Sequence, residues 1–160
     1  MNEFSHSAKV YSTVRIAETC DVKMGPHTFI GDHAFIAVGR LVMDSGAQIN
    51  AHACLTGGKG AVYLGRDSVV SYGVLIMTRT DTPAGRKMND ASPETRRAIQ
   101  SGDVLIGEDA FVGAYAVLCP GVIVGNRACV GSGTFLSNNV PPDTIIYPAQ
   151  RLVIKARKRF

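Results

Sequence analysis

Residues 104–142 read VLIGEDAFVGAYAVLCPGVIVGNRACVGSGTFLSNNVPP, and an aliphatic residue leads each successive group of six. The leading residues are Ile106, Val112, Leu118, Val124, Val130 and Leu136. A Gly or another small residue usually follows each of them. A period of six fits neither the 3.6 of an amphipathic helix nor the alternation of a half-buried strand. It is typical of repeats that wind a parallel β-helix, in which the aliphatic residue points into a prism.

Three such groups of six close one triangular coil, so residues about 18 apart stack at about 4.8 Å, the spacing of neighbouring strands. The same period extends back to Met24. We count a leading aliphatic or Met at Val42 and, after one inserted residue, at Ile49. Every leading position between Met24 and Leu136 is aliphatic or Met. The sequence therefore predicts an all-β fold, a parallel β-helix of hexapeptide repeats.

The chain has 160 residues, which is the length of one domain. We expect coils over about residues 10–77 and 104–141, preceded by a loose polar arm at residues 1–9. Residues 78–103 show no repeat and are expected to protrude as a loop. Residues 142–160 are expected to form a short C-terminal cap and a basic tail, because a solenoid needs its open end covered.

The loop at residues 78–103 contains five basic and four acidic residues. Ser92, Pro93 and Glu94 match an N-cap, a first-turn proline and an acid at the positive end of a helix. We therefore predict one short helix that ends near Ile99. A loop this long in a regular chain is usually functional or disordered.

The formal charge of +4 is concentrated at one end. Five basic residues lie in residues 151–160, so the rest of the chain sums to −1, which disfavours a nucleic-acid-binding face. No apolar run approaches the roughly 20 residues of a membrane span. The first residues do not match a secretion signal, so we expect a soluble, cytoplasmic protein. The four cysteines show no metal spacing.

Residues 106–153 resemble the C-terminal half of the hexapeptide-repeat acyltransferases. This family includes the sugar O-acetyltransferases and nucleotide-sugar N-acetyltransferases of surface-polysaccharide synthesis. The resemblance implies a left-handed β-helix, a homotrimer, and acetyl-coenzyme A bound in the cleft between neighbouring prisms, with no metal. A flat-sided prism cannot wrap a long cofactor by itself, whereas two adjacent prisms can.

The resemblance also implies a set of cofactor-binding residues. Ala114 and Ser132 match small residues whose backbone contacts the pantetheine arm. Ser137 and Asn138 stand where the family commonly has Thr-Lys at the adenosine end. Arg151 falls near a basic residue that meets the phosphates, and it is needed more here because Asn138 is uncharged.

The general base is implied by the same resemblance, but the match is incomplete. The family usually carries a His in a Thr-x-Thr-His-Pro context within the loop, and here Asp81 occupies that place. A carboxylate with an ordinary pKa near 4 is a poor base, although burial can raise that pKa. His52 lies one coil before the loop and is the other candidate base.

The histidines at 27, 33 and 52 each follow a leading residue by three places. This is the corner of a coil, where the backbone often adopts the left-handed conformation that His tolerates. We expect His33 and His52 to stack on one edge. A zinc site of the carbonic-anhydrase-like type needs two histidines five residues apart, and no pair has that spacing.

The sequence thus predicts an acyltransferase that moves an acetyl group from acetyl-coenzyme A directly to a hydroxyl or amine of a sugar or nucleotide sugar. His52 or Asp81 would take the proton, and a backbone N–H would stabilise the oxyanion. Two alternatives stay open at this point. One is a catalytically silent binding or scaffold protein of the same fold, and the other is an acetyltransferase for a non-sugar acceptor.

Overall fold

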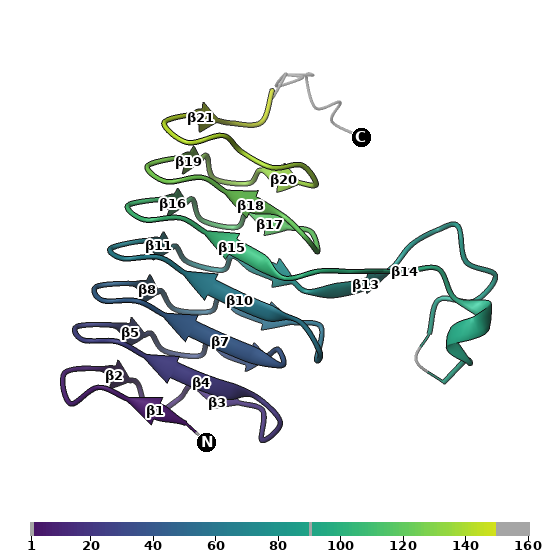
Figure 1. Cartoon of the computed structure of the whole chain (residues 1–160). Coiled ribbons are helices and arrows are strands. Elements are labelled where there is room, and N and C mark those ends of the chain that lie inside the picture. The colour runs from purple at the N-terminus through teal and green to yellow at the C-terminus, as the bar shows by residue number, and fades with distance from the viewer. Residues whose placement is uncertain (1, 90, 150–160) are drawn as a thin grey trace, which may run out of the picture.

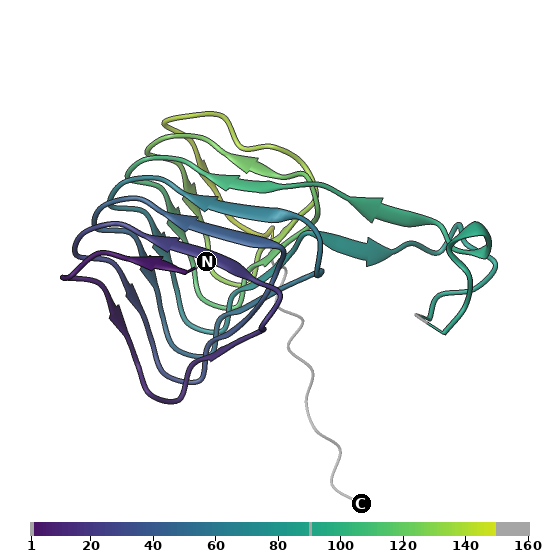
Figure 2. The ribbon, with the colours of Figure 1, turned by 60° about the horizontal axis from the view of Figure 1, so that its bottom comes forward.

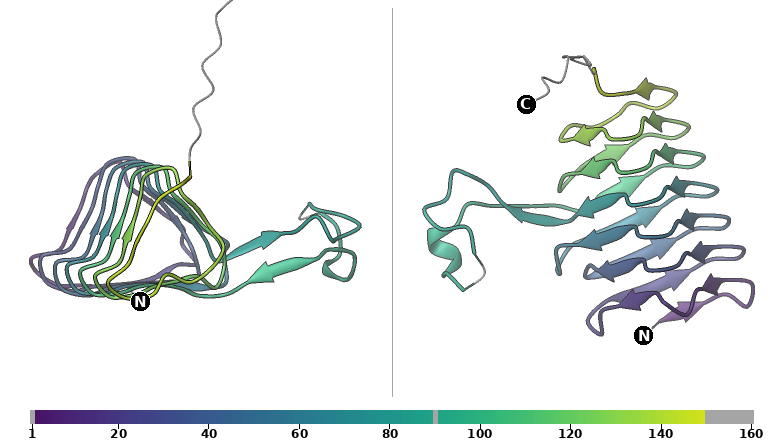
Figure 3. Two further views of the ribbon diagram at one scale, coloured as in Figure 1. Left: turned by 90° about the horizontal axis from the view of Figure 1, so that it is seen from above. Right: turned by 180° about the vertical axis from the view of Figure 1, so that it is seen from behind.

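The computed structural model describes residues 2–89 and 91–149, and these residues wind into a β-helix of about seven coils (Figure 1). Each complete coil contributes one short strand to each of three parallel sheets. Seen along its axis, the solenoid has a triangular cross-section (Figure 3). The predicted all-β parallel helix is confirmed, and the arrangement is consistent with a left-handed coil.

Each sheet contains one strand from every coil it crosses, and we name the sheets A, B and C. Sheet A contains β1 (Glu3–Phe4), β4 (Asp21–Met24), β7 (Arg40–Met43), β10 (Ala61–Leu64), β15 (Val104–Ile106) and β18 (Ile123–Val124). Sheet B contains β2 (Lys9–Val10), β5 (Phe29–Ile30), β8 (Gln48–Ile49), β11 (Val69–Val70), β16 (Phe111–Val112), β19 (Cys129–Val130) and β21 (Ile145–Ile146). Sheet C contains β3 (Arg15–Ile16), β6 (Phe35–Ala37), β9 (Cys54–Thr56), β12 (Leu75–Met77), β17 (Val117–Leu118) and β20 (Phe135–Leu136). Coils 1 to 6 each run through A, B and C in that order, and β21 belongs to a partial coil 7.

The core is the interior of the prism, filled by the leading aliphatic residues. Ile30, Ile49 and Val70 pair in register on neighbouring strands of sheet B, and all three are fully buried. Each such residue removes its apolar surface from water at roughly 25 cal/mol per Å². Because the column continues from coil to coil, the interior is one hydrophobic cluster.

Two parts of the predicted register are corrected by the structure. Met43, not Val42, faces the interior, since Met43 pairs with Met24 and only 1% of it is exposed. The extra residue therefore lies before Met43 instead of before Ile49. The first coil also begins earlier than expected, because β1 and β2 pair with coil 2 where a loose arm was predicted.

Residues 79–101 interrupt the coils and form an arm that protrudes from the solenoid between coils 4 and 5 (Figure 2). Its base is an antiparallel pair of strands, β13 (Arg79–Asp81) and β14 (Ile99–Ser101). The predicted short helix is confirmed only in part: a 3₁₀ helix forms at Glu94–Arg96, but it ends before Ile99 and has no side-chain N-cap. The chain pairs β13 with β14 instead, which satisfies backbone groups that a short isolated helix would leave open.

Two side chains at the C-terminal end of the insertion anchor the arm to the flanking coils. Asp103 accepts a hydrogen bond from the Ala61 backbone N–H at 2.8 Å, and Gln100 donates one to the Pro120 carbonyl at 3.2 Å. These two contacts join the end of the arm to coil 4 and to the corner after coil 5. The arm therefore leaves the prism in a defined direction.

The C-terminal segment continues the solenoid as far as it is described. The β-prone stretch after Pro142 forms β21, which pairs parallel with β19. The rest of the predicted cap and basic tail, including Arg151, lies outside the described residues. Within residues 2–89 and 91–149, no helix is long and apolar enough to cross a membrane.

Candidate functional site

One corner of the prism carries several of the predicted site residues. We call it the B/C edge, the corner at which each coil passes from sheet B to sheet C. It is formed by Asp32 and His33 in coil 2, Ala51 and His52 in coil 3, Tyr72 and Gly73 in coil 4, Ala114 and Tyr115 in coil 5, and Ser132 and Gly133 in coil 6. Backbone hydrogen bonds join successive corners, for example from His52 N–H to the Asp32 carbonyl at 2.9 Å.

The second residue of each B/C corner has a positive φ. His33 and His52 have φ values of 59° and 61°, so the left-handed conformation expected for these corner histidines is confirmed. Their rings stack, with centroids 5.1 Å apart and planes inclined by 22°. The expected stacking is therefore also confirmed. His27, with φ of 58°, lies on a different edge, between sheets A and B.

His52 is solvent-exposed, so a substrate can reach its ring. The neighbouring corner below it is held by short polar contacts. Thr13 accepts a hydrogen bond from His33 N–H at 2.9 Å and donates one to Asp32 at 2.8 Å. His52 thus lies on a fixed stack whose lower end is tied to coil 1.

Asp81, the other candidate base, lies in β13 on the arm and forms an ion pair. Arg97 donates from Nε to Asp81 Oδ1 at 2.7 Å and from a second nitrogen to the other carboxylate oxygen. Only 7% of the Arg97 side chain and 18% of the Asp81 side chain are exposed. The hydrogen bonds from Arg97 hold the pKa of Asp81 below its usual value. This arrangement argues against Asp81 as a general base, because burial has not raised its pKa.

Ala114 and Ser132 both lie on the B/C edge, one coil apart. Ala114 accepts a hydrogen bond from Gly133 N–H at 2.9 Å, and Ser132 is exposed. Gly113 lies just before Ala114, and a side chain would not fit there, because an added Cβ would lie 2.6 Å from the Ser132 nitrogen. Gly113, Ala114 and Ser132 therefore leave the backbone of coils 5 and 6 accessible at this edge, next to the exposed side chain of Tyr115.

Ser137 and Asn138 lie elsewhere. They follow β20 at the C/A edge, the corner where sheet C passes to sheet A, and Asn138 Nδ2 is 3.4 Å from Ser137 Oγ. The arm leaves from the same edge. The full width of sheet C thus separates these two residues from Ala114 and Ser132 within one chain.

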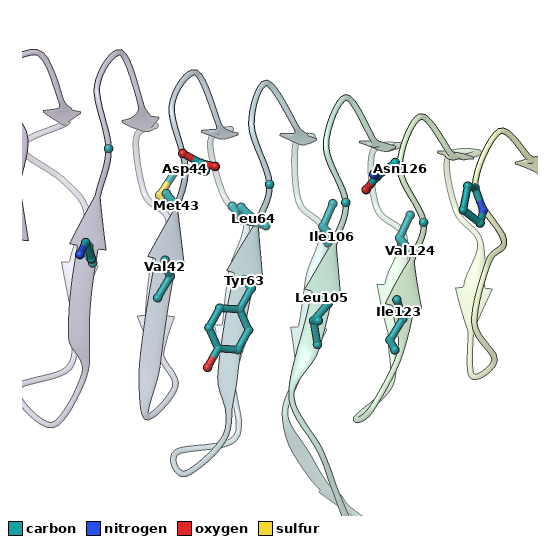
Figure 4. Close-up of a pocket in the computed structure, with 16 residues that line it drawn as sticks. Val42, Met43, Asp44, Tyr63, Leu64, Leu105, Ile106, Ile123, Val124 and Asn126 are labelled. Atoms are coloured by element: carbon teal, nitrogen blue, oxygen red, sulfur yellow. The ribbon is translucent and has the colours of Figure 1, made fainter.

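Two hollows lie away from the B/C edge. A groove of about 560 Å³ runs over the outer face of sheet A, where Val42, Tyr63, Leu105 and Ile123 project from successive strands (Figure 4). A pocket of about 620 Å³ lies at the foot of the arm, lined by Phe35, Met77 and the Asp81–Arg97 pair among others. Neither contains a residue predicted for the cofactor.

The described residues contain no cluster of metal ligands, and three of their cysteines are disfavoured as nucleophiles. They contain no group of three or more His, Cys, Asp or Glu side chains placed to hold a metal ion. Burial raises the pKa of the thiols of Cys20, Cys54 and Cys119, which disfavours their nucleophilic thiolate form.

Sequence reasoning missed the two tyrosines of the B/C edge. Tyr72 is 56% exposed and Tyr115 is 72% exposed, and Tyr115 has a φ of 58°. The repeat register could have indicated Tyr115, because Tyr115 follows Val112 by three places, as the corner histidines follow their own leading residues.

Comparison with known proteins agrees with the repeat pattern. Residues 103–138 match the family described as bacterial transferase hexapeptide (six repeats). A chloramphenicol acetyltransferase from Escherichia coli is 32% identical over 127 residues, which cover 77% of this chain and 53% of that protein. WbbJ from Escherichia coli K12, named for an O-acetyl transferase role in lipopolysaccharide biosynthesis, is 30% identical over 59% of this chain and 50% of its own length. The chain spans about half the length of these relatives.

Among solved structures, a variant of the N-acyltransferase AntD from Bacillus cereus superposes with a TM-score of 0.82 at 20% identity. The match covers 95% of this chain and 83% of that one, and that structure contains dTDP-4-amino-4,6-dideoxyglucose and coenzyme A. At this identity the likeness establishes the fold. The family match and the coil register show that residues 103–138 are a run of bacterial transferase hexapeptide repeats.

Proposed function

We propose that the protein transfers an acetyl group from acetyl-coenzyme A to a hydroxyl or amine of a sugar or nucleotide sugar. The arrangement of His52, Ala114 and Ser132 on one edge carries this proposal. These residues come from three different coils, and the first is the candidate base while the other two are candidates for the cofactor wall. The proposal includes a cytoplasmic location, where acetyl-coenzyme A is available, and a role in polysaccharide synthesis like that named for WbbJ.

The residues present fit a pantetheine arm above His52. Gly113, Ala114 and Ser132 carry no bulky side chains, so a long, thin chain can approach the backbone at these residues, beside the exposed Tyr115. Coenzyme A, when bound, supplies the activated acetyl thioester. The B/C edge would hold and orient it so that the thioester lies toward coil 3.

We propose that the active enzyme is a homotrimer. Ser137 and Asn138 lie at the C/A edge, across sheet C from Ala114. A single prism cannot bring both edges to one cofactor, but cyclic symmetry can place the C/A edge of one subunit against the B/C edge of the next. The arm leaves from the C/A edge, so it would reach over the neighbouring subunit's site.

In the proposed reaction, His52 accepts the proton from the acceptor hydroxyl or amine as the oxygen or nitrogen attacks the thioester carbonyl. A backbone N–H stabilises the tetrahedral oxyanion. Collapse breaks the carbon–sulfur bond, and the proton on His52 passes to the departing thiolate. Acetylated sugar and free coenzyme A are the products, and no covalent enzyme intermediate forms.

A second candidate differs only in its acceptor. The chloramphenicol acetyltransferase match favours a non-sugar hydroxyl compound as substrate. A catalytically silent scaffold is the third possibility, because the family's loop histidine is replaced by the ion-paired Asp81.

A thiol-release assay tests all three. Wild type, His52→Asn and Asp81→Asn would be incubated with acetyl-coenzyme A and a panel of methyl glycosides, dTDP-4-amino-4,6-dideoxyglucose and chloramphenicol. We expect turnover with a sugar, lost in His52→Asn. Turnover with chloramphenicol alone would favour the second candidate, and no turnover with any acceptor would favour the scaffold.

A further inference from the structure

Tyr115 adopts a backbone conformation that large aromatic residues rarely use. Its φ is 58°, in the left-handed region, and 72% of the residue is exposed. That region favours Gly, Asn, Asp and His, and for a bulky residue it is an outlier that the surrounding structure must maintain. An exposed, strained aromatic residue is therefore a feature that packing alone does not explain.

The other positive-φ residues have ordinary explanations. Apart from glycines, those within residues 2–89 and 91–149 are three histidines, three aspartates and Arg127. Arg127 forms a two-pronged ion pair with Asp143, at 2.6 and 2.8 Å. Among the described residues, by contrast, no hydrogen-bond partner meets the Tyr115 hydroxyl. Arg127 and Tyr115 are the two bulky side chains that the described part of the chain has in this conformation, and of these only Tyr115 lacks a partner for its polar end.

The Tyr115 ring extends down onto the coil below its own. A Cβ added at Gly73 would lie 2.5 Å from Tyr115 Cε1, so the ring covers the Gly73 backbone in coil 4. Gly73 has no side chain at the one position where the ring lies. Tyr72 is next to Gly73, is 56% exposed, and accepts a hydrogen bond from Tyr115 N–H at 2.9 Å.

This placement puts the ring between the two halves of the proposed site. His52 is in coil 3, the ring of Tyr115 lies over coil 4, and Ala114 is in coil 5. In the proposed reaction, an acetyl group held near Ala114 in coil 5 has to reach past coil 4, where the Tyr115 ring lies, to meet an acceptor near His52 in coil 3. The flat, exposed ring would therefore lie near the point of transfer in that reaction.

We propose that Tyr115, with Tyr72 beside it, is the binding residue for the acceptor sugar, and that its ring stacks on the apolar face of a pyranose. This inference rests on the proposed function. The C–H face of a pyranose is flat and apolar, and its hydroxyls at the rim can bond to a tyrosine hydroxyl, which suits a surface with an apolar body and a polar tip. Ala114 and Ser132, which have small side chains, would still be free to contact the pantetheine arm.

The test compares Tyr115→Asn and Tyr115→Phe with Asp109→Asn. Asn tolerates the left-handed conformation, so Tyr115→Asn should leave the thermal unfolding midpoint unchanged or higher. It should raise the KM for the acceptor about tenfold or more, a loss typical of an aromatic contact, while the KM for acetyl-coenzyme A stays within about twofold. Tyr115→Phe should keep most of the acceptor affinity. Asp109, with φ of 54° on the A/B edge of the same coil, is the control and should change neither constant.

Binding without turnover separates this inference from the proposed function. Ligand-observed NMR would use methyl glycosides and dTDP-4-amino-4,6-dideoxyglucose as probes, with dTDP as the nucleotide control. Sugar signals that depend on Tyr115 would support the inference even if the protein transferred no acetyl group. No sugar contact with wild type would overturn it, as would a lower unfolding midpoint with unchanged acceptor KM, or a rise confined to the KM for acetyl-coenzyme A.

Discussion

Among single residues, His52 is the one on which the proposed reaction depends most. Its conformation was predictable, because a residue three places after a leading aliphatic falls at a corner, and His tolerates positive φ. Its stacking on His33 was predictable from the same spacing. The repeat spacing could not predict that Arg97 is the partner of Asp81. The pairing of β13 with β14 in the arm, and not the repeat, places Arg97 next to Asp81.

Replacing His52 with Asn should lower kcat by about 100-fold or more, because the general base is lost while the corner conformation is retained. His27→Asn is the matched control, since His27 has the same φ region but lies on the A/B edge. Steady-state thiol release measures both. Equal activity of the two variants would remove His52 from the mechanism.

The Asp81–Arg97 pair should make the arm sensitive to acid. The folded pKa of Asp81 is lowered, so the pair stabilises the arm above the ordinary carboxyl pKa of about 4, and this stabilisation is lost as pH falls through the folded value. Hydrogen-exchange protection of Thr82 N–H, which bonds to the Ala98 carbonyl, reports it. In Asp81→Asn the protection should be low at neutral pH and should not fall further in acid. An unchanged acid dependence in that variant would assign the effect to another group.

At the scale of elements, the strands were more predictable than the insertion. The six-residue period located the inward-facing residues, and it slipped by one only at Val42, where two adjacent aliphatic residues both fit the pattern. The arm was expected to contain a helix because Ser92, Pro93 and Glu94 match a helix start. Local capping signals did not outweigh the pairing of β13 with β14, which joins residues about 20 apart in sequence.

The close stacking of coils predicts a specific sensitivity at Gly113. An added Cβ would lie 2.6 Å from the Ser132 nitrogen, so Gly113→Ala should lower the free energy of unfolding by about 1–3 kcal/mol through overpacking. Chemical denaturation measures this loss.

Gly133→Ala is the control for that variant. Gly133 has a φ of 71° but open space around its Cα, so Ala there should cost only the left-handed penalty of about 1–2 kcal/mol, with no shift of the neighbouring coil. If Gly113→Ala were neutral, the coils would separate more easily than their hydrogen bonds imply.

At the scale of the whole molecule, the predicted β-helix follows from composition and period, but the complete site does not follow from one chain. Ala114 and Ser132 lie on one edge, and Ser137 and Asn138 on another. Neither periodicity nor local propensity reports how two copies meet. The assembly therefore stays a prediction, and it has its own test.

Mixing two inactive variants should restore activity if each site uses two subunits. One variant is His52→Asn, and in the other a flexible linker replaces the arm. Each alone should be inactive, whereas random trimers of the two contain one intact site in most assemblies, giving about a quarter of wild-type activity. Sedimentation equilibrium would verify the trimer. No recovery on mixing would mean that edge and arm act within the same subunit, or that the arm is not part of the site.

The most direct measurement is a crystal structure of the protein with coenzyme A. The account predicts a trimer in which the pantetheine arm lies along Ala114 and Ser132 with its sulfur directed toward His52. It also predicts Ser137 and Asn138 of a neighbouring subunit at the adenosine end. Coenzyme A in the groove over sheet A, or a single subunit with no inter-prism cleft, would contradict it.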